Sequence, residues 1–161
     1  MNRRHAIHAG AVAGLSLWLA GCATVARERA AGSFSGRLAL RIDTEPVQAF
    51  SAGFDLVGDA ATGSLTLSSP LGQTLAVVRW SPVQAELQRG EERTRRGTLD
   101  ELTTELAGTA LPVTALFDWL AGRATPAAGW RVDLSRHAEG RLSAERTAPA
   151  PRAELRLILA P

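Results

Sequence analysis

Few residues of this chain have the chemistry of a catalytic or metal site. Cys22 is the only cysteine, and His137 is the only histidine after residue 8. A Ser-His-Asp triad would have to use His137, but no Gly-x-Ser-x-Gly nucleophile turn accompanies it. One histidine and one thiol are too few ligands for a zinc site. The sequence therefore predicts a protein that is not an enzyme and uses no metal or other cofactor.

The reactive group of Cys22 has a different context. Arg3 and Arg4 precede an apolar run, "AGAVAGLSLWLA", which is short for a membrane span, and "LAGC" follows at residues 19–22. A basic start, a short apolar segment and small residues before a cut are typical of a secretory signal. With the cysteine in place the segment resembles a lipoprotein signal, which implies cleavage before Cys22 and a lipid on its sulfur. The alternative is an uncleaved membrane anchor with a chance cysteine.

This resemblance sets the expected organisation of the chain. Residues 1–21 are predicted to be the signal peptide, 22–33 the lipidated N-terminus with a short tether, and 34–161 one domain. Ala23 follows the cysteine, where an aspartate tends to retain lipoproteins at the inner membrane of enteric bacteria. We therefore expect the periplasmic face of the outer membrane. A lipid on Cys22 leaves no thiol for a disulfide, so the apolar core alone must hold the fold.

The charge balance argues against a nucleic-acid partner. The formal net charge is +2, and all 18 basic residues are arginines. Removal of the signal takes Arg3 and Arg4 away and leaves 16 arginines against 16 acids. A nucleic-acid-binding domain would carry a basic excess, and none remains. Arg93, Arg95 and Arg96 form a small basic cluster that could contact an acidic protein or lipid head groups, although most such clusters are only solvated.

The sequence pattern predicts that short strands and two helices form the framework of any site. Apolar residues alternate with polar ones over 37–42, 48–56, 63–69, 83–89, 129–136, 140–147 and 152–159. Residues 74–80 are apolar on both faces, and residues 91–97 form a polar edge or strand end. Period-two alternation with turns at short intervals is typical of an antiparallel meander. The sequence thus predicts a mainly β, α+β fold of about eight or more strands.

Two helices interrupt the strands. Thr98 to Glu101 form a capping box, and Gly108 ends the first helix. Pro112 opens the second helix, which Gly122 closes. Each helix has an apolar stripe of about three turns, so both are expected to cover the inner face of the sheet.

The turn at residues 68–73, "SSPLGQ", contains a residue that does not suit a turn. Pro70 and Gly72 are ordinary turn residues, but Leu71 gains nothing from water at a hairpin tip. From the residues alone, Leu71 could fold back onto the core.

The order of these segments resembles the LolB family. The similarity rests on "GRLAL", "AFSAGFDL", "LTLSSPLGQTLAVV", "LDELTTELAGTALPVTALFDWLAGR" and "GWRVDL" after the lipid-attachment motif. It implies an incomplete, half-open antiparallel β-barrel with two central helices covering an apolar cavity. It also implies a receptor that accepts acylated lipoproteins from a LolA-like periplasmic carrier and inserts them into the inner leaflet of the outer membrane.

The same resemblance implies roles for particular residues. The turn Pro70, Leu71 and Gly72 would protrude and insert Leu71 into the membrane. Residues on the inward faces would line the acyl cavity: Leu38, Leu40, Phe50, Phe54, Leu65, Leu67, Leu116, Trp119 and Leu120. Period-two alternation alone cannot distinguish a cavity from a filled core.

Two departures from the family pattern keep other functions open. The segment before the first strand is short, and a strand between the second helix and Gly129 is missing. The alternatives are a lipid-anchored accessory or structural protein without cargo transfer, a reduced relative of LolB, or a carrier of another amphiphile. In each case we expect a monomer.

Overall fold

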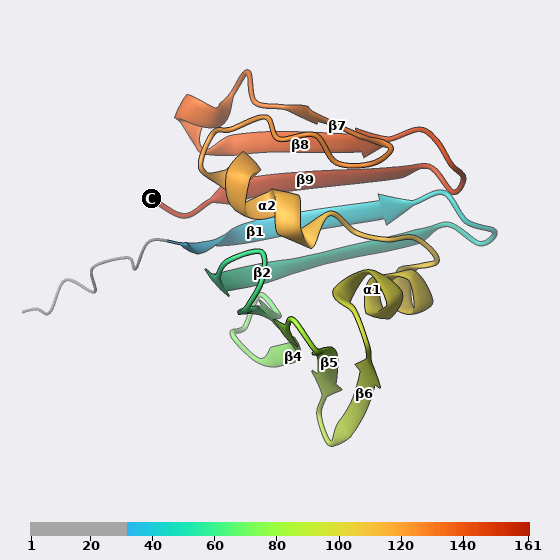
Figure 1. Cartoon of the computed structure of the whole chain (residues 1–161). Coiled ribbons are helices and arrows are strands. Elements are labelled where there is room, and N and C mark those ends of the chain that lie inside the picture. Colours follow the sequence, from blue (N-terminus) through green and yellow to red (C-terminus); the bar gives the residue numbers. More distant parts are fainter. Residues whose placement is uncertain (1–31) are drawn as a thin grey trace, which may run out of the picture.

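A nine-stranded antiparallel sheet forms the framework of residues 32–161, the part of the chain that the computed structural model describes (Figure 1). The strands are β1 (Ser33–Ile42), β2 (Gln48–Gly58), β3 (Gly63–Ser68), β4 (Thr74–Ser81), β5 (Gln84–Arg89), β6 (Glu92–Arg96), β7 (Trp130–Asp133), β8 (Arg141–Arg146) and β9 (Ala153–Leu159). The predicted signal peptide, Cys22 and most of the tether lie outside the described residues.

The strand order is β6-β5-β4-β3-β2-β1-β9-β8-β7. β6 and β7 are therefore edges, and the sheet is not closed into a barrel. This confirms the predicted α+β fold with an open barrel of about eight or more strands. Residues 91–97, predicted to be an edge or strand end, contain the edge strand β6.

The centre of the sheet joins the two ends of the chain. β1 pairs with β2 over ten residue pairs, from Ser33↔Val57 to Ile42↔Gln48. On its other side β1 pairs with β9, from Gly36↔Leu159 to Ile42↔Ala153. The first and last strands are thus neighbours at the centre of the sheet. Both helices lie on one face of this sheet (Figure 1).

The sequence signals place both helices correctly. α1 (Leu99–Ala107) begins after Thr98, whose hydroxyl accepts a hydrogen bond from the Glu101 N–H at 3.1 Å. It ends at Gly108, which has a φ of 69° that favours glycine. α2 (Val113–Leu120) begins after Pro112 and buries most of its side chains.

Helix α2 fills the centre of the core. Trp119 is fully buried, and its indole Nε1 donates a hydrogen bond to the Thr125 carbonyl at 2.8 Å. The ring of Phe117 makes edge-to-face contacts with Phe34 and Trp80, at centroid distances of 6.5 and 6.1 Å. Such contacts add to the free energy of burial and fix the angle of the helix on the sheet.

A short 3-10 turn, η1 (His137–Glu139), closes the end of α2. His137 Nε2 lies 2.9 Å from the Leu120 carbonyl, which belongs to the last turn of that helix. Helix carbonyls there lack internal partners, so the imidazole satisfies one of them. His137 therefore has a structural role beside α2 at the start of β8, and it is half-buried.

None of the helices within residues 32–161 has the length and apolar character needed to cross a membrane.

We expect Trp119→Ala to lower the free energy of unfolding by about 3–5 kcal/mol, because it removes the largest fully buried side chain of the core. Trp119→Phe keeps an aromatic ring and loses the donor to Thr125, so its loss should be smaller. Chemical denaturation followed by circular dichroism measures both. Equal losses for the two variants would contradict the assigned role of ring packing.

Candidate functional site

The turns between strands lie at two opposite ends of the sheet, and these ends differ in how many exposed apolar residues they carry. The turns at 43–47, 69–73 and 90–91 lie at one end, which we call the mouth end. The turns at 59–62 and 82–83 and the start of β1 lie at the other, which we call the anchor end. Within residues 32–161, four of the seven exposed large apolar residues are at the mouth end: Val47, Phe50, Leu71 and Leu75.

A cavity of about 600 Å³ lies at the mouth end, between the inner face of β1–β5 and helix α1 with the linker that follows it. Only three of its lining residues are polar: Gln48, Arg89 and Thr103. The apolar lining residues are Leu40, Ile42, Val47, Ala49, Phe50, Leu65, Leu67, Leu75, Ala76, Val78, Leu87, Leu106, Ala107, Leu111 and Val113. An aliphatic wall of this kind can hold a hydrocarbon chain and offers little to a polar solute.

The inner wall of the cavity consists of buried side chains, whereas the side chains at its rim are partly exposed to solvent. The side chains of Ile42, Ala76 and Leu87 are buried at its wall, whereas Val47 and Phe50 are about half exposed although both line it. Phe50 shares the inward-facing parity of Phe54 and Leu56 on β2, which are buried. Phe50 is exposed because the helices do not extend over it, so the cavity opens to water there.

A β-bulge brings one more apolar side chain to the rim. Leu67 pairs with Ala76, but Ser68 pairs with Thr74, so Leu75 has no partner on β3. A bulge re-aims the extra residue relative to the strict alternation of a strand. As a result Leu75 and Ala76, which alternation would place on opposite faces, both line the cavity.

Thr103 attaches the α1–α2 linker to α1 beside the cavity. Its hydroxyl donates to the Asp100 carbonyl at 3.2 Å and accepts a hydrogen bond from the Leu111 N–H, also at 3.2 Å. Both its hydrogen-bonding functions are therefore satisfied although Thr103 is buried. The bonds hold Leu111 against the cavity and leave the wall apolar.

The turn containing Leu71 follows directly from the rim. The Gly72 N–H donates to the Ser69 carbonyl at 2.9 Å, and the Ser69 N–H donates to the Gln73 carbonyl at 2.8 Å. Gly72 has a φ of 81°, which a residue with a Cβ rarely adopts. Leu71 is 89% exposed at the tip of this rigid turn and does not fold back onto the core.

The predicted lining residues fall into two groups in the structure. Leu40, Phe50, Leu65 and Leu67 line the cavity. Phe54, Leu116, Trp119 and Leu120 are buried in the packed core, and Leu38 packs against that core. The division follows α2, which covers the anchor half of the inner face and leaves the mouth half hollow.

Sequence reasoning missed the lining residues Val47, Leu106 and Leu111 and the mouth role of Leu75. Val47 lies in a turn, and Leu75 depends on the bulge, so period-two alternation gives no signal for either. Leu106 belongs to the apolar stripe of the first helix, and the stripe alone does not predict that this residue lines a cavity. Its place at the cavity depends on the distance between α1 and the sheet.

The arginine cluster of β6 is engaged in contacts within the domain. Arg95 pairs with Glu86, and this hydrogen bond holds the pKa of Glu86 below its ordinary value. Arg96 pairs with Glu105 of α1. These contacts attach α1 to the edge of the sheet, and Arg93 is the member without an ion pair among the described residues.

Comparison with known proteins gives a consistent family. The family described as "Outer membrane lipoprotein LolB" matches residues 30–149. The chain belongs to the LolB family. "Outer-membrane lipoprotein LolB" of Bordetella petrii is 33% identical over 177 aligned positions, which cover 91% of this chain and 89% of that protein. "Outer-membrane lipoprotein LolB" of Cupriavidus metallidurans is 38% identical over 138 positions, which cover 78% of this chain and 65% of that protein.

Membership of the LolB family settles the class and the location. The chain is an outer-membrane lipoprotein of a family that is not enzymatic. The alignment with the Bordetella petrii protein has 177 positions, whereas this chain has 161 residues, so the LolB relative contains residues without a counterpart here. The family match ends before β9, although β9 lies between β1 and β8 in the sheet.

We expect Ala76→Phe to be tolerated, because its ring can enter the cavity, with a change of less than about 1.5 kcal/mol in the free energy of unfolding. Ala144→Phe is the matched control, because Ala144 is buried in the filled part of the core. Overpacking there should cost about 1–3 kcal/mol. Chemical denaturation measures both, and equal destabilisation would contradict an open cavity.

Proposed function

We propose that this chain is a receptor that takes acylated lipoproteins from a LolA-like periplasmic carrier and inserts them into the inner leaflet of the outer membrane. In this proposal Cys22 carries the lipid anchor, the cavity holds acyl chain, and Leu71 enters the bilayer. The domain acts as a monomer. No bond of the cargo is made or broken.

The observation that carries the proposal is the apolar cavity of about 600 Å³ that opens beside the turn of Leu71. A methylene group takes roughly the volume of a water molecule, about 30 Å³. The cavity therefore has space for a fatty-acyl chain of common length. This supports cargo binding over an accessory protein with a filled barrel.

The exposed rim of the cavity makes the transfer of a bound acyl chain from the cavity to a bilayer favourable. Each methylene removed from water contributes about 0.8 kcal/mol. Near Val47 and Phe50 a bound chain would remain in partial contact with water, because these rim residues are exposed. A bilayer would bury the same chain completely, so release from the cavity into the membrane is downhill.

Leu71 can reach the leaflet while Cys22 stays in it. Leu71 lies in the β3–β4 turn at the mouth end, whereas the tether from Cys22 enters at the anchor end, and the ten residues of β1 that run between these ends span about 34 Å. Ten residues, 23–32, join Cys22 to Ser33, and ten residues extend to at most about 36 Å. The tether is therefore just long enough for the mouth end to touch the membrane that holds the anchor.

We expect Leu71→Glu to retain cargo and to lose insertion, because burial of one leucine contributes about 1.5–3 kcal/mol and a carboxylate opposes it. Val83→Glu is the matched control, since Val83 is 80% exposed in a turn at the anchor end. The measurement is incorporation of a carrier-bound lipoprotein into outer-membrane vesicles. If both variants still incorporated the lipoprotein into vesicles, Leu71 would have no role in insertion. If Leu71→Glu also lost cargo binding, the role of Leu71 would not be confined to insertion.

The first experiment on the whole proposal mixes the protein with a carrier loaded with one acylated lipoprotein and follows which protein holds the cargo. Movement of cargo to this chain supports the receptor. Retention on the carrier by a folded domain contradicts it and favours a reduced relative of LolB.

A further inference from the structure

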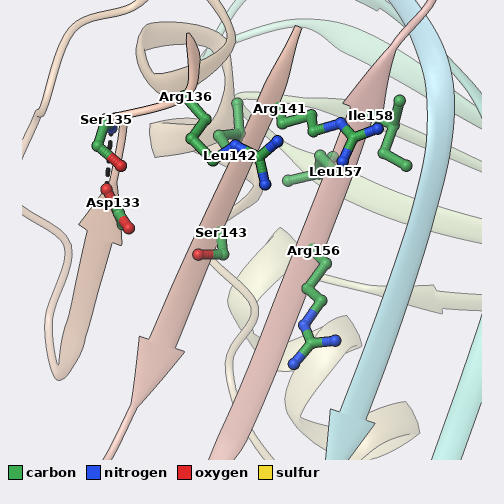
Figure 2. A pocket seen from close by; sticks show the side chains of 9 residues that line it. All are labelled: Asp133, Ser135, Arg136, Arg141, Leu142, Ser143, Arg156, Leu157 and Ile158. Atoms are coloured by element: carbon green, nitrogen blue, oxygen red, sulfur yellow. Dashed lines mark hydrogen bonds between the residues drawn. The ribbon is translucent and has the colours of Figure 1, made fainter. Parts of the chain in front are cut away.

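The outer face of the sheet carries a basic surface that the proposed cargo path does not use. A groove of about 340 Å³ crosses β8 and β9 there, and three arginines line it: Arg136, Arg141 and Arg156. Figure 2 shows Arg136 and Arg141 extending on the same side of these strands, with Arg156 farther along β9. The hydroxyl-bearing residues Ser135 and Ser143 complete the polar part of the groove.

The pairing of three central strands extends this surface to β1. Ile158 of β9 pairs with Arg37 of β1 on one side and with Arg141 of β8 on the other. Paired residues of neighbouring antiparallel strands point to the same face and lie about 5 Å apart. An isoleucine that is 49% exposed is thus flanked by two arginines on the outer face. We call Arg37, Ile158, Arg141 and the adjoining groove the arginine face.

Among the described residues, the acids near the arginine face form no ion pair with two of its arginines. Arg136 pairs with Glu139 at 2.6 Å, and Arg156 pairs with Glu154 at 2.7 Å. Asp133, at the edge of the groove, accepts a hydrogen bond from the Ser135 N–H at 2.9 Å. Arg37 and Arg141 have no carboxylate within 4 Å in the part of the chain that the structure describes.

We propose that the arginine face docks on the phosphate groups of anionic lipids in the leaflet that holds the anchor. The guanidinium group binds phosphate oxygens in a bidentate manner, and the exposed Ile158 between the arginines suits the boundary of headgroups and acyl chains. This inference rests on the proposed lipidation of Cys22, but not on cargo transfer.

The position of the arginine face favours a membrane over an acidic protein. Arg37 is the fifth of the ten residues of β1 and Ile158 is the last but one of β9, so the arginine face lies between the middle of the sheet and the end where β1 begins and the tether from Cys22 enters. Ten residues of chain keep that end within about 36 Å of the lipid anchor. In the docked pose the inner face, with the cavity and the helices, points away from the leaflet and is open to the carrier, whereas insertion of Leu71 requires the domain to tip.

The test uses the full lipidated chain in vesicles. Lipid occupies the sulfur of Cys22, so Ala39→Cys provides the only free thiol, and Ala39 faces Arg156 across β1 and β9 on the outer face. A fluorophore there is exposed to quenchers on the lipid headgroups, in phosphatidylcholine vesicles with or without one third phosphatidylglycerol. The same label at Gln84, an exposed residue at the start of β5, reports on the opposite part of the sheet.

We expect strong quenching at residue 39 only in anionic vesicles, with a decrease as salt is added. Each arginine at an anionic surface changes the docking equilibrium several-fold, so Arg37→Gln with Arg141→Gln should lower the ratio of docked to free domains roughly thirtyfold. The control replaces Arg79 and Arg93 with glutamine. Arg79 lies on β4 and Arg93 on β6, and both strands are far from the arginine face in the strand order. The control therefore removes the same amount of positive charge from another part of the sheet.

Three results would overturn the proposal. Quenching could be equal in the two kinds of vesicle, or the Arg37 and Arg141 variant could behave like its control. Alternatively that variant could retain membrane contact and lose capture by the carrier, which would assign the arginine face to an acidic protein. Flotation with vesicles is scored separately, so failure of the lipid anchor is distinguished from failure of the arginine face.

Discussion

The inner face of the sheet is longer than two short helices can cover, and this mismatch determines the rest of the domain. Helices of nine and eight residues are about 12–14 Å long, whereas the central strand spans about 34 Å. α2 packs closely around Trp119 and fills the anchor half. The mouth half has an apolar wall without a matching apolar layer above it, and the cavity is the result.

The two halves of the domain therefore have different physical properties. The filled half gives the stability that a domain without a disulfide requires, through Trp119 and the contacts of Phe117. The hollow half keeps its apolar surface inside a cavity that a ligand can enter. The same surface on the outside of the protein would promote association with other protein molecules. The rigid turn at Leu71 extends the same surface outward by one side chain.

The sequence was sufficient for the features that depend on local spacing. Period-two alternation located the strands, and Thr98, Gly108 and Pro112 located the helices, because caps and alternation act over a few residues. It could not separate Leu65, which lines the cavity, from Phe54, which is buried in the core, because both point inward. That difference depends on where α2 lies. The arginine face depends on the pairing of β9 with both β8 and β1, and the pairing with β1 joins residues more than one hundred positions apart.

The position of β9 also determines how the domain is assembled. β1 is the first strand of the sheet in sequence, yet one of its two neighbours is the last strand, so the sheet has a high contact order and its closing step is entropically costly. Without β9 the sheet would separate into a six-stranded piece, β1–β6, and a two-stranded piece, β7–β8. Each piece would have an unprotected edge, which invites pairing with other chains. A chain cut short by this one strand would therefore present two unpaired edges, those of β1 and β8, at the centre of the sheet.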